Sequence, residues 1–330
     1  MTPPAAGEVA LACAADARYA MPLGAMLRSA VVHLDPARRL TVHVLAEGIR
    51  AGDRDRVARS CAREGVTLHW IAADPDALRD LPTWGRMPRT TYQRLLLPDL
   101  LPDLGKLVWL DCDVVVAADL GRLWDIDMDG RPALAVQDMV VPHVSSRLGI
   151  RDFRALGIPA EAKYFNAGVM VLDLQRWRRD DVAGRALEYL RAGGDRVLLW
   201  DQEGLNAALH GRWGELDPRW NQNASVAGRR FFRRPRHMDA ATYRLVVEDP
   251  WVVHYCGNLK PWSLPDTGDP ARDRFFLHLD ATPWSGWRPK RTMTGRLAAA
   301  YESSRARRLL HPAEGWALRA VARRSRWEAG

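Results

Sequence analysis

Short apolar runs alternate with predicted helices along the first part of the chain. The runs at 8–14, 40–45 and 66–71 have the length and composition of buried strands. Residues 22–34 carry apolar side chains at helical spacing, and a second helix is predicted at 50–64. This alternation predicts an α/β fold with a mainly parallel, Rossmann-like sheet flanked by helices, whose ligand cleft lies at the carboxyl ends of the strands.

The remaining elements continue the pattern less regularly. They are predicted from apolar runs, helical spacing, capping residues and Pro- or Asp-rich breaks. In order, they are a loop at 74–89, a helix capped by Thr90, a strand at 133–137, an irregular flap at 139–162, a strand at 164–173, a helix at 174–190, a helix that begins near Trp200, and a strand from Trp251 into a Gly-containing loop.

The stretch 107–116 carries the most specific local chemistry. Four apolar residues lead into Asp111 and Asp113, and three valines follow. This pattern predicts a buried strand that breaks open at its end, with both carboxylates on one side and Cys112 turned into the core. Paired carboxylates suit Mg²⁺ or Mn²⁺, which commonly hold the phosphates of a substrate. Aspartates that cap a turn after the strand are the alternative.

Other polar side chains stand where elements begin or end. Asp16 ends the first strand, where it fits a helix cap and a cleft residue equally well. Arg94 lies among leucines, which indicates either a solvated or paired side chain or one that reaches a phosphate or carboxylate in the cleft. Asp201, Gln202 and Glu203 stand at the head of a helix, where the helix dipole favours acids in any protein.

Two further segments predict a close approach of a ligand. Ala167 and Gly168 form a small-residue pair at the start of a strand, where a ligand can come near the backbone. His254, Gly257 and Lys260 lie within seven residues, which fits a pocket for metal and phosphate. A single His after a strand is nevertheless more often structural.

Composition and charge narrow the class of protein. The chain has 330 residues, 47% of them apolar, which allows one large domain with appendages or two modest domains. Its net charge is +8, and residues 285–330 alone contain eleven Lys or Arg against three Glu. The body is therefore neutral overall and is not expected to bind nucleic acid.

The basic tail itself contains two predicted short helices, near 294–310 and 315–328. Both mix Ala, Leu and Trp with many Arg, which fits either a solvated terminus or an amphipathic anchor on anionic lipid, with Trp316 and Trp327 at the headgroup level. No apolar run is long enough to span a membrane and no signal peptide is recognised, so the expected location is cytoplasmic, with a peripheral position on the inner face of the plasma membrane as an extension. Four scattered cysteines argue against zinc and disulfides.

Five separated motifs resemble glycosyltransferase family 8 in their order and spacing. This family of retaining enzymes includes glycogenin and the bacterial lipopolysaccharide α-galactosyltransferases and α-glucosyltransferases, which look closest. The motifs are Ala14-Ala15-Asp16-Ala17-Arg18-Tyr19-Ala20, Thr91-Tyr92-Gln93-Arg94-Leu95, Leu110-Asp111-Cys112-Asp113-Val114, Tyr164 to Val169 with Trp200-Asp201-Gln202-Glu203, and His254 to Trp262. The resemblance covers about 8–265. It implies a GT-A fold, a nucleotide-sugar donor, usually a UDP-hexose, and Mn²⁺.

The resemblance also implies roles for individual residues. Asp111, Asp113 and His254 would ligate Mn²⁺, with Mg²⁺ as the substitute. The diphosphate would be held by Lys260 and the backbone at Gly257, and uracil and ribose by Ala14, Asp16 and Tyr19. The sugar pocket would be lined by Arg94, Asn166, Ala167, Asp201 and Gln202, with Gln202 under the anomeric carbon. Asp138 would face the reacting sugar or the acceptor. An amide is a poor nucleophile, which favours front-face attack, while a covalent intermediate stays open.

The chain departs from the family pattern at Ala17 and Arg18, where members often carry acidic or amide residues, and at Glu203, where many carry Asp. Arg18 could pair with phosphate or shift the base preference. The implied activity is transfer of a hexose, from UDP-galactose or UDP-glucose, to a hydroxyl of a glycan, lipid-linked or small-molecule acceptor. The implied division is a GT-A domain at 1–270 and a basic Trp- and Arg-rich extension at 271–330.

Three other functions are compatible with parts of the sequence. A sugar-phosphate nucleotidyltransferase also uses an α/β sheet and paired carboxylates, but the N-terminal part of this chain lacks the Gly-rich loop such enzymes show. A non-catalytic protein that binds a nucleotide sugar or an anionic partner would use the basic tail. A self-glucosylating protein like glycogenin would modify one of the seven tyrosines.

Overall fold

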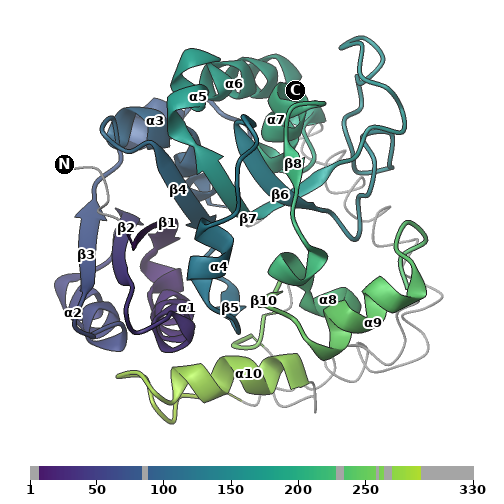
Figure 1. Ribbon diagram of the computed structural model, residues 1–330. Coiled ribbons are helices and arrows are strands. Elements are labelled where there is room, and N and C mark those ends of the chain that lie inside the picture. The colour runs from purple at the N-terminus through teal and green to yellow at the C-terminus, as the bar shows by residue number, and fades with distance from the viewer. Residues whose placement is uncertain (1–6, 84–87, 228–233, 258–259, 264–269, 291–330) are drawn as a thin grey trace.

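The sheet at the centre of the computed structural model runs in the order β3-β2-β1-β4-β7-β6-β8 (Figure 1). The residues that the structure describes are 7–83, 88–227, 234–257, 260–263 and 270–290. The strands of this sheet are β1 (Glu8–Asp16), β2 (Arg39–Glu47), β3 (Val66–Ile71), β4 (Lys106–Leu110), β6 (Ala133–Gln137), β7 (Phe165–Asp173) and β8 (Gly214–Glu215). β1, β2, β3 and β4 are mutually parallel, which confirms the predicted α/β fold with a mainly parallel sheet.

A second, smaller sheet has the order β5-β10-β9. It consists of β5 (Val114–Val116), β9 (Gln222–Asn223) and β10 (Val252–His254). β4 belongs to the large sheet and β5 to the small one, so the predicted strand at 107–116 does break after Leu110. The residues between them, 111–113, therefore lie where the chain passes from one sheet to the other.

β7 runs antiparallel to both of its neighbours, β4 and β6. Leu110 at the end of β4 pairs with Val169 near the start of β7, and the Asp111 amide donates to the Gly168 carbonyl at 2.8 Å. The amino end of β7 thus meets the carboxyl end of β4. This reversal brings 166–168 to the same edge of the sheet as the paired aspartates.

Alternate residues of the central strands face two different cores. Val108 and Leu110 pack with the residues of α1 and α2, whereas Leu107 and Trp109 pack with those of the helices on the other face. α1 (Ala20–His33) and α2 (Ala51–Ser60) cover one face, and α3 (Leu97–Leu100), α5 (Leu174–Arg179), α6 (Val182–Gly193) and α7 (Trp200–Leu209) cover the other (Figure 1). This two-sided burial accounts for the nearly continuous apolar strands.

The other helices connect or flank these layers. α10 (Pro270–Leu279) packs beside α1 (Figure 1). The two helices meet in a small core that includes Ala25 and Phe275. The other α-helices outside the two layers are α4 (Leu120–Trp124), α8 (Ala224–Ala227) and α9 (Ala240–Glu248). The 3-10 helices are η1 (Ala17–Tyr19), η2 (Pro75–Leu78), η3 (Arg89–Leu96), η4 (Gly194–Arg196) and η5 (Pro218–Asn221).

Three helix predictions were wrong in detail. The segment 174–190 forms two helices, α5 and α6, because Asp181 takes a left-handed conformation (φ 46°) and caps α6. The predicted helix capped by Thr90 is instead η3 followed by α3, since Pro98 lacks the amide that a continuous α-helix needs. α2 ends at Ser60 because the turn into β3 uses a left-handed residue, Gly65 (φ 77°).

Two other predictions meet different outcomes. Residues 139–162 carry no helix or strand, apart from the bridge between His143 and Lys163 at their border, as expected for an irregular segment. The two tail helices predicted at 294–310 and 315–328 lie outside the described residues. Within the part of the chain that the structure does describe, no helix combines the length and apolar character that crossing a membrane requires.

Candidate active site

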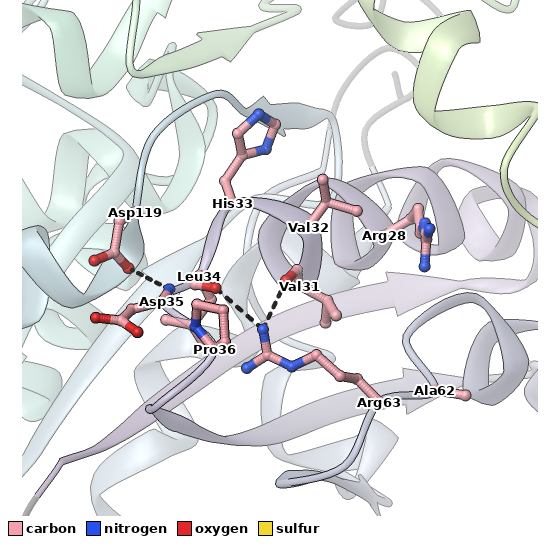
Figure 2. Close-up of a pocket in the computed structure, with 10 residues that line it drawn as sticks. All are labelled: Arg28, Val31, Val32, His33, Leu34, Asp35, Pro36, Ala62, Arg63 and Asp119. Carbon is pink, nitrogen blue, oxygen red and sulfur yellow. Dashed lines mark hydrogen bonds between the residues drawn. The ribbon is translucent and has the colours of Figure 1, made fainter.

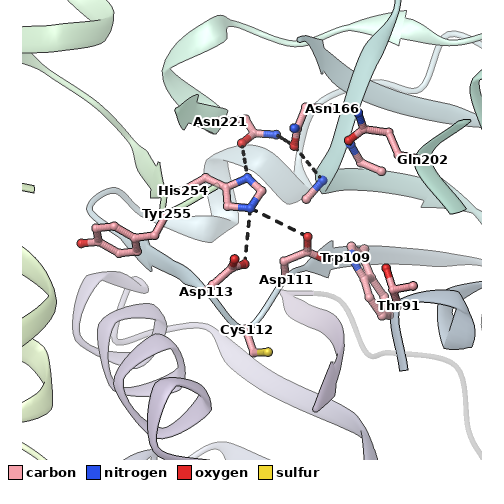
Figure 3. Close-up of polar contacts among 12 residues, drawn as sticks. Thr91, Trp109, Asp111, Cys112, Asp113, Asn166, Gln202, Asn221, His254 and Tyr255 are labelled. Carbon is pink, nitrogen blue, oxygen red and sulfur yellow. Dashed lines mark hydrogen bonds and ion pairs between the residues drawn. The ribbon is translucent and has the colours of Figure 1, made fainter. Parts of the chain in front are cut away.

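Asp111, Asp113 and His254 meet at the junction of the two sheets, as the sequence predicted (Figure 3). The two aspartates occupy the break between β4 and β5, and His254 ends β10, which pairs antiparallel with β5. The His254 Nε2 atom lies 3.3 Å from a carboxylate oxygen of Asp113 and 3.8 Å from one of Asp111. One ligand atom from each residue lies within 4.8 Å of the other two. Cys112 turns away into the core.

Each carboxylate has one oxygen held by the protein and one turned toward His254. The Oδ1 atom of Asp111 accepts from Trp109 Nε1 at 2.9 Å and from Arg94 Nη2 at 2.8 Å. The Oδ2 atom of Asp113 accepts from Lys260 Nζ. Asp111 Oδ2 and Asp113 Oδ1 are the oxygens that approach the imidazole. Two carboxylate oxygens and one imidazole nitrogen form a donor set that fits Mn²⁺ or Mg²⁺.

The neighbouring cation Lys260 keeps Asp113 ionised despite its burial. Burial alone raises the pKa of Asp113, but the charge of Lys260 and the contact with His254 outweigh it and hold that pKa well below its ordinary value. Conversely, burial lowers the pKa of Lys260, and Asp113 reverses the effect and raises it. The site therefore carries a fixed negative charge next to a fixed positive one, the combination needed to bind both a cation and a phosphate.

The imidazole of His254 lies directly against Gly168 on β7. A Cβ atom at Gly168 would lie 2.1 Å from Cε1 of His254 and 2.6 Å from its Nδ1. The small-residue pair that suggested a ligand near the backbone therefore leaves space for a side chain of the protein itself. On its other edge, Nδ1 lies 2.9 Å from Oδ1 of Asn221 (Figure 3).

A connected polar group lies beside Asp111, Asp113 and His254, and it consists of Asp138, Asn166, Ala167 and Gln202. The Asn166 amide donates to Asp138 Oδ2 at 2.9 Å, and Gln202 Nε2 lies 3.4 Å from the same oxygen. The Gln202 oxygen accepts from the Ala167 amide at 3.0 Å. Asp138 itself is 5% exposed, and its Oδ1 caps the start of the 139–162 segment by accepting two backbone amides.

Arg94 and Asp201 form a buried ion pair that adjoins Ala167 and Asp111. Arg94 contacts Asp111, Asp201 and the Ala167 carbonyl oxygen, and its guanidinium lies over the Trp109 ring at 4.6 Å. Asp201 also accepts from the Thr91 hydroxyl at 2.6 Å. Both charges thus interact with protein groups, so their contacts fit a role in positioning Asp111 and the start of β7.

Comparison with known proteins decides the family. The family model described as Glycosyl transferase family 8 matches residues 10–264, which is most of the chain and contains all the residues above. The chain belongs to glycosyl transferase family 8.

Individual relatives of this family 8 chain include two bacterial proteins. It is 28% identical over 276 residues to General stress protein A of Bacillus subtilis (strain 168), covering 82% of this chain and 93% of that protein. It is 25% identical over 276 residues to a Lipopolysaccharide 1,2-glucosyltransferase of Escherichia coli (strain K12), covering 83% and 78%. A crystal structure of the galactosyltransferase LgtC, in complex with donor and acceptor sugar analogs, has a TM-score of 0.70 at 27% identity, covering 87% of this chain and 99% of that one.

The family 8 residues expected to hold the nucleotide lie around the end of β1. Asp16 accepts from the backbone amides of Arg18 and Tyr19, as a cap, and its other oxygen pairs with the Arg18 side chain at 2.7 Å. The Tyr19 ring meets Trp262 edge-on, with centroids 5.9 Å apart, and burial raises the pKa of Tyr19 to about 12. Arg18 is therefore tied to Asp16 in this structure.

Ala14 and the loop after β10 complete this side. The Ala14 carbonyl accepts from the Cys112 thiol at 3.2 Å, which fixes the end of β1 beside the paired aspartates. Gly257 has a φ of 82° and open space where a side chain would stand, and Lys260 also donates to the Tyr255 carbonyl at 2.7 Å. The motif residues Asn258 and Leu259 lie outside the described residues.

One residue near the site, Asn221, was not predicted, whereas Glu203 was placed at the head of a helix. Asn221 was not singled out, because one asparagine in the run Asn221-Gln222-Asn223 has no distinctive spacing relative to the aspartates. Glu203 has a structural explanation: its Oε2 accepts from the amides of Leu198 and Leu199, at 2.6 and 3.1 Å, and its Oε1 from the Tyr189 hydroxyl at 2.7 Å. It anchors the start of α7.

A separate pocket lies at the far end of α1 from Asp16 and Tyr19 (Figure 2). Its Arg63 guanidinium donates to the carbonyl oxygens of Val31 and Leu34, at 3.0 and 3.1 Å. These carbonyls lie at the end of α1, where they lack partners within the helix. Asp119 accepts from the Asp35 amide at 3.2 Å. These side chains satisfy backbone groups, so the pocket is assigned no part in donor binding.

Proposed function

We propose that this chain is a metal-dependent, retaining hexosyltransferase that uses a UDP-sugar, UDP-galactose or UDP-glucose, as donor. The observation that carries the proposal is the convergence of Asp111, Asp113 and His254, each with one donor atom directed at a shared point. Two relatives, the lipopolysaccharide glucosyltransferase and the galactosyltransferase LgtC, are named for the transfer of a hexose, which supports hexose transfer by this chain. Mn²⁺ is the expected ion and Mg²⁺ the substitute.

The charged groups fit a diphosphate leaving group. Asp111, Asp113 and His254 would hold a divalent ion, which when bound would offset the negative charge that the phosphates gain as the glycosidic bond breaks. Lys260, now paired with Asp113, provides a second cation within reach of the same oxygens. The open space at Gly257 allows a phosphate to approach the backbone at that residue.

The amide-rich edge of β7 fits the sugar. Asn166, Asp138 and Gln202 offer both donors and acceptors, which are the groups that distinguish sugar hydroxyls. We assign Gln202 to the position under the anomeric carbon. Since an amide is a poor nucleophile, the expected course is front-face attack, in which the acceptor hydroxyl gives its proton to the leaving phosphate.

The base and ribose are assigned to Asp16, Tyr19 and the backbone at Ala14. The Tyr19 ring, supported edge-on by Trp262, offers a flat surface near the end of β1. The acceptor is expected to be a hydroxyl of a glycan, a lipid-linked sugar or a small molecule. The segment 139–162 is capped by Asp138, so it adjoins the amino acids assigned to the sugar. We assign the choice of acceptor to this segment.

Release of free nucleotide from a panel of UDP-, GDP- and dTDP-sugars, with Mn²⁺ and with EDTA, tests this proposal. We expect hydrolysis of a UDP-hexose that requires the metal, and an α-linked product by proton NMR when an acceptor is supplied. Asp113→Asn should lower the rate about 100-fold or more, because it removes one ligand charge. Asp152→Asn, at an exposed ion pair, is the control and should keep full activity. Full activity of Asp113→Asn, or metal-independent turnover, would contradict the proposal.

A further inference from the structure

A series of side-chain hydrogen bonds links His254 to Asp138 through two asparagines. Figure 3 shows its first part, from His254 through Asn221 to Asn166. His254 Nδ1 lies 2.9 Å from Asn221 Oδ1, Asn221 Nδ2 lies 2.9 Å from Asn166 Oδ1, and Asn166 Nδ2 lies 2.9 Å from Asp138 Oδ2. The four side chains come from β10, η5, β7 and the end of β6. They connect the three metal-site residues with the residues assigned to the sugar.

The direction of every bond in this series is fixed from its ends. Asp138 Oδ2 accepts, so Asn166 must present its NH₂ group to it. The Asn166 oxygen also accepts from the Gly168 amide at 3.0 Å, which confirms its orientation independently. Asn221 must then donate its NH₂ group to Asn166 and offer its oxygen to His254. An oxygen only accepts, so Nδ1 of His254 carries a hydrogen and Nε2 is the atom that faces Asp111 and Asp113.

The backbone explains why Asn221 is available for this contact. It ends η5 and immediately precedes β9, which pairs in parallel with β10 so that Asn223 stands opposite His254. Its side chain is enclosed: Asn221 is 3% exposed, and the preceding residue, Trp220, is 1% exposed. A buried amide with both ends occupied by hydrogen bonds has one stable orientation, and a rotation would leave two polar groups unsatisfied.

We propose that Asn221 is a positioning residue of the metal centre, which holds the His254 imidazole with Nε2 directed at the shared point between Asp111 and Asp113. This inference rests on the proposed function, because it takes that point as a metal site. Asn221 does not reach the ion itself. Its effect is to fix the tautomer and the ring angle of a ligand, and outer partners of this kind typically change metal affinity by about 10- to 100-fold.

Replacement of Asn221 separates the two contacts it makes. Asn221→Leu keeps the volume approximately and removes both hydrogen bonds. Asn221→Asp keeps an oxygen for His254 Nδ1 and loses only the bond to Asn166. Asn221→Ser, which is too short to reach His254, is a second removal variant in case the leucine variant does not fold. Gln222→Leu is the matched control, because it removes the neighbouring buried amide, which donates to the Val246 carbonyl away from the metal site.

Binding of Mn²⁺ is measured by the loss of the free-ion EPR signal, for the full chain with Mn²⁺ alone and with Mn²⁺ plus UDP, against a protein-free blank. Thermal unfolding of each variant is followed in parallel. We expect Asn221→Leu and Asn221→Ser to weaken Mn²⁺ binding about 10- to 100-fold. Asn221→Asp should stay within about 3-fold of the parent, and Gln222→Leu should lower stability and leave Mn²⁺ binding unchanged.

The outcomes separate the inference from the proposed function. Parent-like Mn²⁺ binding by Asn221→Leu, or by Asn221→Ser where the leucine variant does not fold, overturns the role of Asn221 and leaves the metal-dependent transferase intact. The role of Asn221 is also overturned if Asn221→Asp and Gln222→Leu weaken Mn²⁺ binding as much as Asn221→Leu does, since that pattern indicates a general loss of packing. If the parent chain binds no Mn²⁺ under either condition, the metal site of the proposed function fails, and the inference fails with it.

Discussion

Arg94 Nε lies 2.6 Å from Asp201 Oδ2, and both side chains are only 4% exposed. The pair joins η3 to α7 beneath the residues assigned to the sugar. The same guanidinium contacts Asp111 at 2.8 Å. One buried cation therefore links Asp111 to the helix that carries Gln202.

Asp201→Asn should destabilise the fold strongly. Burial raises the pKa of Asp201, and Arg94 opposes that rise, so the pair is held by mutual charge in a place with little water. Removing one partner of a buried pair typically costs about 3–5 kcal/mol of unfolding free energy. The same change at the exposed pair of Asp152 and Arg196 should cost less than about 1 kcal/mol. Urea unfolding of both variants measures the contrast, and equal losses would show that Arg94 is satisfied without Asp201.

Gly168→Ala should reduce metal binding while the sheet still forms. The new Cβ would lie 2.1 Å from His254 Cε1, so the imidazole must move away from β7 and from the two aspartates. We expect Mn²⁺ affinity to fall at least about 10-fold, in the range seen when a ligand loses its orientation. Mn²⁺ titration by EPR measures this affinity.

Gly52→Ala is the matched control for that substitution. Gly52 lies in α2, and a Cβ there meets nothing within 4 Å. Alanine should therefore be neutral or stabilise the chain by up to about 1 kcal/mol, without any change in Mn²⁺ affinity. Parent-like Mn²⁺ binding by Gly168→Ala would mean that β7 shifts to accommodate the methyl group and that the contact does not position His254.

Local pattern was enough to predict several parts of this site. The break at 111–113 followed from apolar residues on both sides of two carboxylates, and β3 (Val66–Ile71) has the predicted bounds. The reversed direction of β7 was not predictable, because strand direction depends on pairing with β4 over a long sequence separation. Asn221 was missed for a similar reason: its partners lie in distant segments, and asparagine is common on surfaces. For Arg94 the sequence left a solvated or paired side chain and one that reaches the cleft as alternatives, and the structure shows it paired with Asp111 and Asp201.

The four cysteines should differ sharply in reactivity. Burial raises the pKa of Cys61 to about 11 and also raises the pKa values of Cys13 and Cys112, so these three thiols stay protonated and enclosed. Cys256 is half-buried. We expect one thiol to react with a disulfide reagent in the native protein and four after unfolding in urea. Cys256→Ser should remove the native reaction, and rapid labelling of more than one thiol would contradict the buried positions of the others.

Acid should weaken the fold partly through His43, which is completely buried on β2. Burial, with a smaller effect of His69, lowers the pKa of His43 from 6.5 to about 4. Between pH 6.5 and about 4 the unfolded chain therefore binds a proton that the folded chain excludes, so the unfolding free energy falls as pH falls. Above pH 6.5 this contribution to the pH dependence vanishes. The slope from this one group approaches about 1.4 kcal/mol per pH unit.

His43→Leu should flatten the decrease in urea stability between pH 6.5 and 4.5, whereas His210→Gln, at a half-exposed imidazole, should leave it in place. An unchanged slope in His43→Leu would show that His43 does not contribute to acid unfolding.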